Sequence, residues 1–527
     1  MTWEKAASLE ELQRGPVLHK SPPKQIAVFL VEGMPYAVDN RCPHEGYPLI
    51  EGSVDGDCEL TCNWHNWRFR LTDGACVLGG DDVRAYGAEV RDGEVWLDLS
   101  DPPPEEVQRK VLEGLRGAYE DRDYGRIARE ITRLQFNGLD PDVALTSALQ
   151  WSHDKLEYGM THAYAASADW LTLSARYADD WERRLVCLAE AVDHMAHDAQ
   201  RHEAYAYPSE GAWAGADAFT VAIEAREREL AESMVVGALR DGVSWAELEP
   251  AFARAALEHF NDFGHSAIWV AKADQWVAFA GEGVGRWLAP PLARSLAYTT
   301  REDLLPEFKR YADALARQPA AFGTGGERPD PAPLFGSSAA KAMDWVVEHE
   351  RKHSVEELYD ALLEAGALHM LHYDMAYQAA YDRPVSSNVG WLDFTHALTF
   401  SNAVRTLCTK HPELWHRGLL QMACFVGRNG GYLDKDLDVS PWNVADGAAF
   451  LAETHETLLD HGLRDPIFSS HVLKTTLAVE AELPGASPSC RAALLAALNR
   501  FLHSPLKQKH TRRLTRQAIA LVGRDFS

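Results

Sequence analysis

Two close pairs of cysteine and histidine stand in residues 41–80, and they restrict the fold of this stretch more than any other feature of the chain. The first pair is Cys42 and His44, and the second is Cys62 and His65. Two thiolates and two imidazoles on two short loops can hold a [2Fe–2S] cluster, in which the cysteines bind one iron and the histidines the other. A Cys₂His₂ zinc site is the alternative, although such sites more often use pairs of closely spaced cysteines.

The residues around both pairs favour the iron–sulfur interpretation. Cys42-Pro43-His44-Glu45-Gly46 and Trp64-His65-Asn66-Trp67 resemble the cluster loops of Rieske proteins. The respiratory kind of Rieske protein adds a disulfide between the two loops, but Tyr47 and Trp64 stand at those positions here. The resemblance therefore implies a lower-potential centre of the kind associated with oxygenases and ferredoxins.

The residues that flank these loops have the pattern of short strands. Residues 25–31 and 35–38 are strand-like and are separated by the turn Glu32-Gly33, and residues 93–97 close the region. We therefore predict a small antiparallel all-β domain over residues 1–100. The proline-rich residues 101–106 cannot continue a strand and are expected to form a stiff linker.

Composition changes after the linker, and residues 107–527 are predicted to form one large all-α domain. Alanine, leucine, glutamate and arginine recur there at helical spacing. The clearest predicted helices are 107–119, 181–200, 216–240, 246–277, 339–348, 355–381 and 392–408. A stretch rich in glycine and proline, residues 318–338, is expected to be a surface loop between two sets of helices. The predicted fold class is thus a small all-β domain followed by a large all-α domain.

Length, charge and cysteine usage narrow the function classes. A chain of 527 residues predicts two or three domains. A formal charge of −26 argues against nucleic-acid binding, which needs basic surface. No apolar stretch approaches the ~18 residues of a membrane span, and the N-terminus has no signal pattern. The eight cysteines suggest a reducing compartment, so a cytoplasmic protein is expected.

An electron-transfer centre needs a recipient for its electrons, and the helical region is rich in histidine. Asp262-Phe263-Gly264-His265 and Asp393-Phe394-Thr395-His396 echo one another. On a helix, this spacing places the carboxylate and the imidazole on one face, as in helical di-iron proteins, which use Glu-x-x-His pairs. A second metal site at Asp262, His265, Asp393 and His396 is one interpretation. Structural, hydrogen-bonded histidines are the other.

A different histidine segment offers an alternative site. Ordinary Rieske oxygenases bind a catalytic iron with two histidines and an aspartate, and His197 and His202 have a similar spacing. His194 stands where the aspartate is expected. His194, Asp198 and His202 lie nearly opposite the apolar stripe of this helix, so a solvated face is the simpler interpretation.

Several short motifs lie along the helical region, and most of them contain a histidine. They are Gly159-Met160-Thr161-His162, Phe263-Gly264-His265-Ser266, Thr395-His396-Ala397-Leu398, His471-Val472-Leu473-Lys474 and residues 412–415. Through these motifs the helical region resembles the questin-oxidase-like family. The resemblance implies a helical protein associated with Baeyer–Villiger-type oxygen insertion into polyketides. It also singles out His162, His265, His396 and His471 among the histidines.

These features support a first hypothesis of an oxygenase. A reductase or ferredoxin would deliver electrons to the [2Fe–2S] cluster. They would pass to one or two non-haem iron ions held by His265 and His396, with Asp262, Asp393, His162 or His471. O₂ and a small aromatic or polyketide-like molecule would be the substrates. Neither nucleic acid nor a membrane is expected as a partner, and whether the chain forms a homo-oligomer is left open. Five tryptophans are candidates for the substrate pocket, although core packing explains most of them equally well: Trp151, Trp170, Trp269, Trp276 and Trp391.

Two further hypotheses remain open at this point. In one, the N-terminal domain is an electron carrier or redox sensor and the helices form a docking platform without further metal. In the other, the chain is an ordinary Rieske oxygenase in which His197 and His202 are the iron ligands.

Overall fold

All strands in the described part of the chain lie before residue 99. The structure is a computed structural model that describes residues 2–199 and 203–524. Its residues pack as two units, Met1–Ala144 and Leu145–Ser527, which are described separately below. The predicted order, a small all-β domain followed by a large helical region, is confirmed.

The strands of the first unit form two antiparallel sheets. Among the described residues, one sheet has six strands in the order β1-β10-β9-β4-β3-β2, and the other has four in the order β5-β6-β7-β8. The bounds of the strands are β1 Trp3–Ser8, β2 Val17–Ser21, β3 Lys24–Val31, β4 Met34–Asp39, β5 Ser53–Val54, β6 Glu59–Thr61, β7 Arg68–Arg70, β8 Cys76–Leu78, β9 Ala85–Arg91 and β10 Glu94–Asp98, with helix α1 at Leu9–Arg14 between β1 and β2. The predicted strands at 25–31 and 35–38 are β3 and β4.

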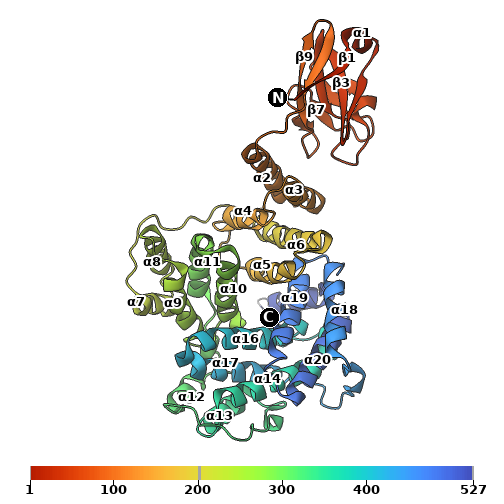
Figure 1. Ribbon diagram of the computed structural model, residues 1–527. Coiled ribbons are helices and arrows are strands. Elements are labelled where there is room, and N and C mark those ends of the chain that lie inside the picture. The colour runs from red at the N-terminus through yellow and green to blue at the C-terminus, as the bar shows by residue number, and fades with distance from the viewer. Residues whose placement is uncertain (1, 200–202, 525–527) are drawn as a thin grey trace. The chain divides into compact units, whose positions relative to one another are not determined.

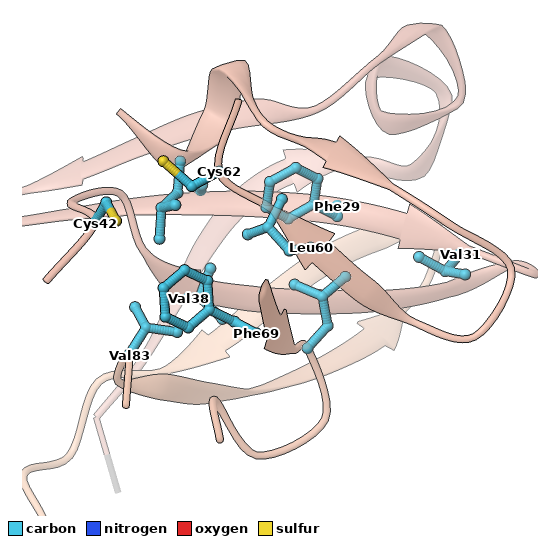
Figure 2. Packing of buried hydrophobic residues seen from close by; sticks show 11 residues of the cluster. Phe29, Val31, Val38, Cys42, Leu60, Cys62, Phe69 and Val83 are labelled. Atoms are coloured by element: carbon cyan, nitrogen blue, oxygen red, sulfur yellow. The ribbon is translucent and has the colours of Figure 1, made fainter. Parts of the chain in front are cut away.

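The two faces of the larger sheet are buried against different hydrophobic clusters. Strand β3 alternates between them, because successive side chains of a strand point to opposite faces. Ile26 and Val28 enter one cluster, while Ala27, Phe29 and Val31 enter the other. Figure 2 shows the second cluster, with the sulfur atoms of both predicted cysteine ligands at the same end of it. The cluster loops therefore rest directly on a packed core.

Two helices after the sheets belong to the same unit. Helix α2 spans Pro104–Asp121 and helix α3 spans Tyr124–Phe136. The buried carboxylate of Asp81, in the loop before β9, accepts hydrogen bonds from Arg126 at 2.9 Å and Arg129 at 2.8 Å and pairs with Arg133 at 3.3 Å. These three arginines lie on α3, so ion pairs with Asp81 hold this helix against the sheets. Helix α2 begins within the stretch 101–106 that the sequence predicts as a linker.

The second unit is built from helices. Their bounds are α4 Val143–Ser152, which starts just before the division between the units, α5 His162–Arg176, α6 Trp181–Ala199, α7 Ala216–Glu224, α8 Arg228–Arg240, α9 Trp245–Leu257, α10 His265–Ala280, α11 Gly285–Tyr298, α12 Tyr311–Arg317, α13 Ala339–His349, α14 Val355–Leu371, α15 Met375–Ala379, α16 Trp391–Lys410, α17 Trp415–Asn429, α18 Gly447–Leu459, α19 Pro466–Glu482, α20 Pro488–His503 and α21 Thr511–Arg524.

The helix predictions locate the segments but miss breaks inside them. The predicted helix 246–277 is interrupted at residues 258–264, where Asp262 and Phe263 have positive φ angles of 39° and 55°. The predicted helices 216–240 and 355–381 are likewise each two helices. Residues 318–338 form an irregular segment apart from one short 3₁₀ turn at Ala332–Leu334. None of the described helices is both long and apolar enough to cross a membrane.

Four helices, α5, α10, α16 and α19, pack side by side in the second unit (Figure 1). Paired residues advance in the same direction on neighbouring helices. On α5 and α10, Asp169 pairs with Lys272, and Thr172 follows with Gln275. The pairs that join α16 to α10 and to α19 advance in the same way: His265 with His396 and Asp274 with Lys410, then His396 with Lys474 and Asn402 with Glu482. The four helices therefore run parallel, which brings four helix N-termini together.

Candidate functional sites

The two cysteines of the first unit begin loops with the same backbone hydrogen bonds. The amide of Cys42 donates to the carbonyl oxygen of Tyr47 at 2.8 Å, and the amide of Cys62 donates to the carbonyl oxygen of Trp67 at 2.7 Å. In each loop the hydrogen bond thus joins the cysteine to the fifth residue after it. The same fold of the backbone is used twice, once before β5 and once between β6 and β7.

A positive φ angle occurs at the same place in both loops. Gly46 has a φ of 79° and Asn66 a φ of 61°, and each donates its amide to the carbonyl oxygen of the loop's cysteine. Glycine adopts this backbone conformation freely, and asparagine tolerates it better than most residues. The sequence therefore specifies both loops through these residues as well as through the ligands.

The four predicted ligands of the first unit converge. Cys42 and Cys62 are buried, and burial raises the pKa of the Cys42 thiol to about 11. The rings of His44 and His65 lie 4.6 Å apart, and the buried Nδ1 of His44 has no hydrogen-bond partner among the described residues. Two buried cysteines, one of them with a raised pKa, and an unpaired imidazole nitrogen fit binding to a cationic metal centre, which stabilises the thiolate. The donor set suits a [2Fe–2S] cluster with mixed ligation.

Aromatic rings surround the two histidines. His44 stacks on Trp67 with centroids 4.7 Å apart, and His65 stacks on Trp64 at 5.2 Å. Tyr47 and Trp64, which stand where respiratory Rieske proteins have the disulfide, meet edge to face at 5.5 Å. Trp64 is 56% exposed, so this end of the unit presents an aromatic surface to solvent.

Four histidines of the second unit meet at the N-terminal ends of the parallel helices. His162 and His265 are the first residues of α5 and α10, while His396 and His471 lie in the second turns of α16 and α19. Gly159 explains how the chain enters α5: its φ is 89°, and a Cβ there would lie 2.3 Å from the carbonyl oxygen of Pro291. His153 and His162 are therefore separated by a tight loop and do not share a helix.

The imidazole nitrogens of these histidines face one another. His396 Nε2 lies 2.9 Å from His265 Nε2, which lies 3.2 Å from His162 Nε2. The ring of His471 contacts those of His162 and His396 at centroid distances of 4.9 Å. The nearest nitrogens of His162, His265 and His396 all lie within 4.8 Å of one another. Three ligand atoms at this separation can bind one metal ion.

The hydrogen bonds of the Nδ1 atoms determine the tautomers of three of these histidines. His265 Nδ1 lies 2.7 Å from the carbonyl oxygen of Asp262, and His396 Nδ1 lies 2.5 Å from that of Leu392. His471 Nδ1 lies 2.6 Å from the carbonyl oxygen of Ile467. A carbonyl oxygen only accepts hydrogen bonds, so each Nδ1 carries the proton and each neutral ring presents a bare Nε2. Metal-binding histidines are oriented in this way.

The bare nitrogens of His265 and His396 need a cation between them. Two lone pairs 2.9 Å apart repel unless a proton or a metal ion separates them. A proton is disfavoured, because burial and the charge of Lys474 lower the pKa of His265 to about 3 and that of His396 well below its usual value. The buried Nε2 of His471 also has no hydrogen-bond partner among the described residues. A metal ion bound between His162, His265 and His396 would satisfy the nitrogens of these three residues.

Two charged residues near the histidines were not predicted from the sequence. Lys474 is buried, its Nζ lies 3.5 Å from His396 Nε2, and burial lowers its pKa to about 7 although Asp169 raises it. Asp169 is also buried and receives a hydrogen bond from Lys272 at 2.6 Å. Position 474 follows His471 by three residues on α19, a spacing that places both on one helix face and was the available sequence signal.

The two predicted carboxylate ligands, Asp262 and Asp393, do not belong to the group of facing Nε2 atoms. Asp262 is in a non-helical turn, its carboxylate lies 3.8 Å from His265 Nδ1, and burial followed by repulsion from Glu302 raises its pKa to about 7. Asp393 accepts a hydrogen bond from the Gly390 amide at 2.8 Å and so caps α16. The two echoing tetrapeptides thus have different local structures, because only the second is helical.

The alternative histidine segment on α6 has an unexpected environment. His194 is buried and contacts Ser470 Oγ at 2.9 Å, so the solvated face expected for this residue is wrong. The reason is that this side of α6 meets another helix: Ser470, which His194 contacts, lies on α19. His197 is 45% exposed and contacts Asp198 at 3.0 Å. His202 lies outside the described residues.

The five candidate pocket tryptophans divide by environment. Trp269 contacts the ring of His265 at 5.1 Å, and Trp391 lines a cavity described below. Trp170 and Trp276 are fully buried, and the Trp276 indole donates to the Tyr164 carbonyl oxygen at 3.0 Å, which marks it as core. Trp151, on α4, is partly exposed.

Comparison with known proteins concerns the first unit. The family model described as Rieske [2Fe-2S] domain matches residues 2–85. The ferredoxin component of the naphthalene 1,2-dioxygenase system of Pseudomonas putida is 31% identical over 101 residues, which are 19% of this chain and 96% of that protein. The 3-phenylpropionate/cinnamic acid dioxygenase ferredoxin subunit of Escherichia coli (strain K12) is 29% identical over 19% of this chain and 95% of its own length. Among solved structures, the ferredoxin of carbazole 1,9a-dioxygenase from Nocardioides aromaticivorans IC177 is 26% identical, with a TM-score of 0.18, over 19% of this chain and all of that one.

Proposed function

Because the chain belongs to the Rieske [2Fe–2S] family through its N-terminal unit, we propose that it is an oxidoreductase that takes up electrons at that unit and uses them at a second metal centre. The second centre is an iron ion, or a pair of ions, held by His162, His265, His396 and His471. The reaction is an O₂-dependent oxidation of a small organic molecule.

One observation carries the proposal. His265 and His396 bring two bare Nε2 atoms within 2.9 Å while both Nδ1 protons are committed to backbone carbonyl oxygens. Buried histidines with a purely structural role normally pair each ring nitrogen with a polar partner. Lone pairs aimed at one another are the arrangement of a metal site, and neutral imidazole suits iron.

The residues of the second unit have separable tasks in this proposal. Asp262, Leu392 and Ile467 orient three imidazoles through their carbonyl oxygens. His396 and His471 are buried and His162 and His265 are partly buried, which limits the access of water to the centre. Iron bound there would supply a site at which O₂ is reduced. In a monooxygenation, two electrons and two protons convert O₂ to one inserted oxygen atom and one water, and the electrons come from a reductase or ferredoxin.

The finer assignments follow the family resemblances. Similarity of the first unit to ferredoxin components of dioxygenase systems supports a redox partner. The resemblance of the second unit to the questin-oxidase-like family supports Baeyer–Villiger-type oxygen insertion into an aromatic or polyketide-like substrate. We also propose that the protein is cytoplasmic. We propose residues 107–527 as the part that carries this activity, with His265 and His396 as its catalytic metal ligands.

Iron analysis of anaerobically purified protein tests the proposal. A [2Fe–2S] cluster alone accounts for two iron atoms per chain, so we expect clearly more than two. The excess should disappear in the double variant His265→Ala/His396→Ala, while the electron paramagnetic resonance signal of the reduced cluster persists. His197→Ala, a histidine on the surface of the same unit, is the matched control and should keep the excess. Two iron atoms per chain in the unaltered protein, with no other metal, would contradict the proposal.

A second candidate function is favoured by the extent of the similarity. The ferredoxin components match over 96% and 95% of their own lengths, so the first unit corresponds to a complete electron carrier. In that case the helical unit is a docking platform without a redox metal. The same iron analysis separates the two functions, because the carrier function predicts the cluster iron alone.

A further inference from the structure

A cavity lies beside the four-histidine centre at the N-terminal ends of α16 and α19. It has a volume of about 360 Å³, within the usual range of small-molecule sites (about 300–1,000 Å³). Most of its wall is apolar and includes Val389, Trp391, Leu392, Phe468, Leu506 and Leu514. Residues 506–510 and the start of α21 cover one side. This wall suits an aromatic or otherwise largely apolar molecule.

Two residues of the wall connect the cavity to the histidines. Leu392 lines it, and the Leu392 carbonyl oxygen bonds to His396 Nδ1. Phe468 lines it, and the preceding residue, Ile467, bonds to His471 Nδ1. Four residues of helix rise only about 6 Å. A molecule in the cavity is therefore about one helical turn from the proposed metal ligands.

Trp391 and His510, two residues that line the cavity, each have a buried ring nitrogen without a hydrogen-bond partner among the described residues. The Nε1–H of Trp391 is one, and Trp391 is only 1% exposed. Because an indole nitrogen only donates, it calls for an acceptor. The other is Nδ1 of His510, a residue whose pKa is lowered by burial and by the charges of Arg513 and Lys507. Leaving such groups unpaired costs free energy, which a polar group of a ligand would reduce once the side chains of the wall move to admit it.

The charges around the cavity favour an anion. Lys507 and Lys509 stand exposed at its rim, and Arg513 lines it. Asp393 is the single acidic residue among the lining residues, and burial raises its pKa although Gly390 and Arg428 lower it. The cations therefore outnumber the anions, and the one carboxylate is already held as a helix cap.

The four-histidine centre needs negative charge for its own reasons. Its described ligands are neutral imidazoles, Lys474 is a cation beside them, and four helix N-termini, each with partial positive charge, converge there. Asp169 offsets part of the Lys474 charge, but a divalent metal ion would add buried positive charge that neutral imidazoles do not balance, which is costly. An anionic ligand next to the centre removes this cost.

We propose that the cavity binds the carboxylate of a largely apolar, aromatic acid, with Trp391, His510, Lys507 and Lys509 recognising the anion and the apolar wall enclosing the ring. Only one part of this proposal rests on the proposed function, namely that the acid is the substrate of the reaction. The cavity and its cations are present without the metal, so binding itself is independent of it.

Calorimetric titration of the full chain with 2-naphthoate tests the proposal, and 2-naphthamide is the uncharged probe of the same shape. We expect 2-naphthoate to bind at least about fivefold more tightly than the amide, as charge-assisted contacts require. Lys507→Gln/Lys509→Gln should remove most of this difference, and Trp391→Phe, which keeps a ring but loses the donor, should weaken 2-naphthoate alone. Lys309→Gln, an exposed lysine elsewhere on the helical unit, is the charge-matched control. Equal binding of acid and amide would overturn the proposal.

Repeating the titration in His265→Ala/His396→Ala separates this proposal from the metal. Retained binding of 2-naphthoate that still depends on Lys507 and Lys509 supports the cavity even if no second metal is found. Binding that is lost in the histidine variant and unaffected by Lys507→Gln/Lys509→Gln would mean that the acid binds the metal directly, and would refute the anion site. A second metal without 2-naphthoate binding would refute the cavity and leave the proposed metal centre intact.

Discussion

The two histidine-bearing sites of this chain are built in opposite ways. The Cys42/His44 and Cys62/His65 site stands on two short loops, each closed by hydrogen bonds among its own neighbours. The four-histidine site draws one residue from each of four helices between positions 162 and 471. The first is specified locally, while the second exists only when distant helices pack. Local specification suits a domain that is reused in many proteins.

Exposure differs between the two sites as much as construction. His65 has a side chain that is 38% exposed, beside the exposed Trp64. His396 and His471 are buried, and burial lowers the pKa of both well below the usual value. An exposed ligand suits exchange of electrons with a partner, whereas a buried, dry centre suits chemistry from which water must be excluded. This difference in exposure agrees with the proposal that electrons enter at the first unit and that the reaction takes place in the second.

The most direct test of the independence of the two sites is to remove the metal ligands of one and to measure the metal content of the other. Cys62→Ser should abolish the [2Fe–2S] cluster, because the thiolate is a direct iron ligand. The metal proposed at the four histidines should remain, since none of its proposed ligands lies in the first unit. Visible absorbance reports the cluster and metal analysis reports the second centre. Loss of both metals in this single variant would show that the sites are not independent.

The attachment of α3 to the sheets gives the next largest expected effect. Asp81→Asn leaves Arg126, Arg129 and Arg133 around a buried neutral group, and breaking such a buried network costs about 3–5 kcal/mol. Thermal unfolding followed by cluster absorbance should show a lower midpoint for the first unit only. Glu89→Gln, which alters an exposed ion pair of the same unit, is the control and should change little.

The same carboxylate predicts a pH dependence. Burial alone would raise the pKa of Asp81, but the charges of Arg133, Arg129 and Arg126 outweigh it and lower the pKa. A lowered pKa in the folded state contributes stability above the unfolded value of about 3.9 and loses it as the pH falls through the folded value. Asp81→Asn should therefore flatten the acid limb of the stability curve. An unchanged acid limb would contradict this assignment.

The smallest expected effect concerns the charge beside the four histidines. Lys474→Met removes a cation whose Nζ is 3.5 Å from His396 Nε2, so a divalent metal ion should bind roughly tenfold more tightly. Titration of metal-depleted protein with Co²⁺, followed by its visible spectrum, measures this. Lys309→Met is the matched control on the exposed surface. Weaker binding in Lys474→Met would instead make the amine itself a ligand.

The sequence alone was enough to propose every ligand of the first site, but it indicated the second site only in part. Cys42, His44, Cys62 and His65 were identifiable because all four lie within 24 residues, counting from 42 to 65, and because Gly46 and Asn66 permit the turns. His162, His265, His396 and His471 were singled out by resemblance. Their meeting was not readable from spacing, because His265 and His396 lie on separate helices with different local structure.

The sequence by itself determined the cluster loops and the change from strands to helices, because both depend on contacts between near neighbours. Tertiary structure alone decided that four helices run parallel and that their N-termini converge. It also buried His194 and Lys474, which periodicity does not identify as buried. A helix reveals from its own residues which side is apolar, but the partner that covers a polar side is set by packing among segments hundreds of residues apart.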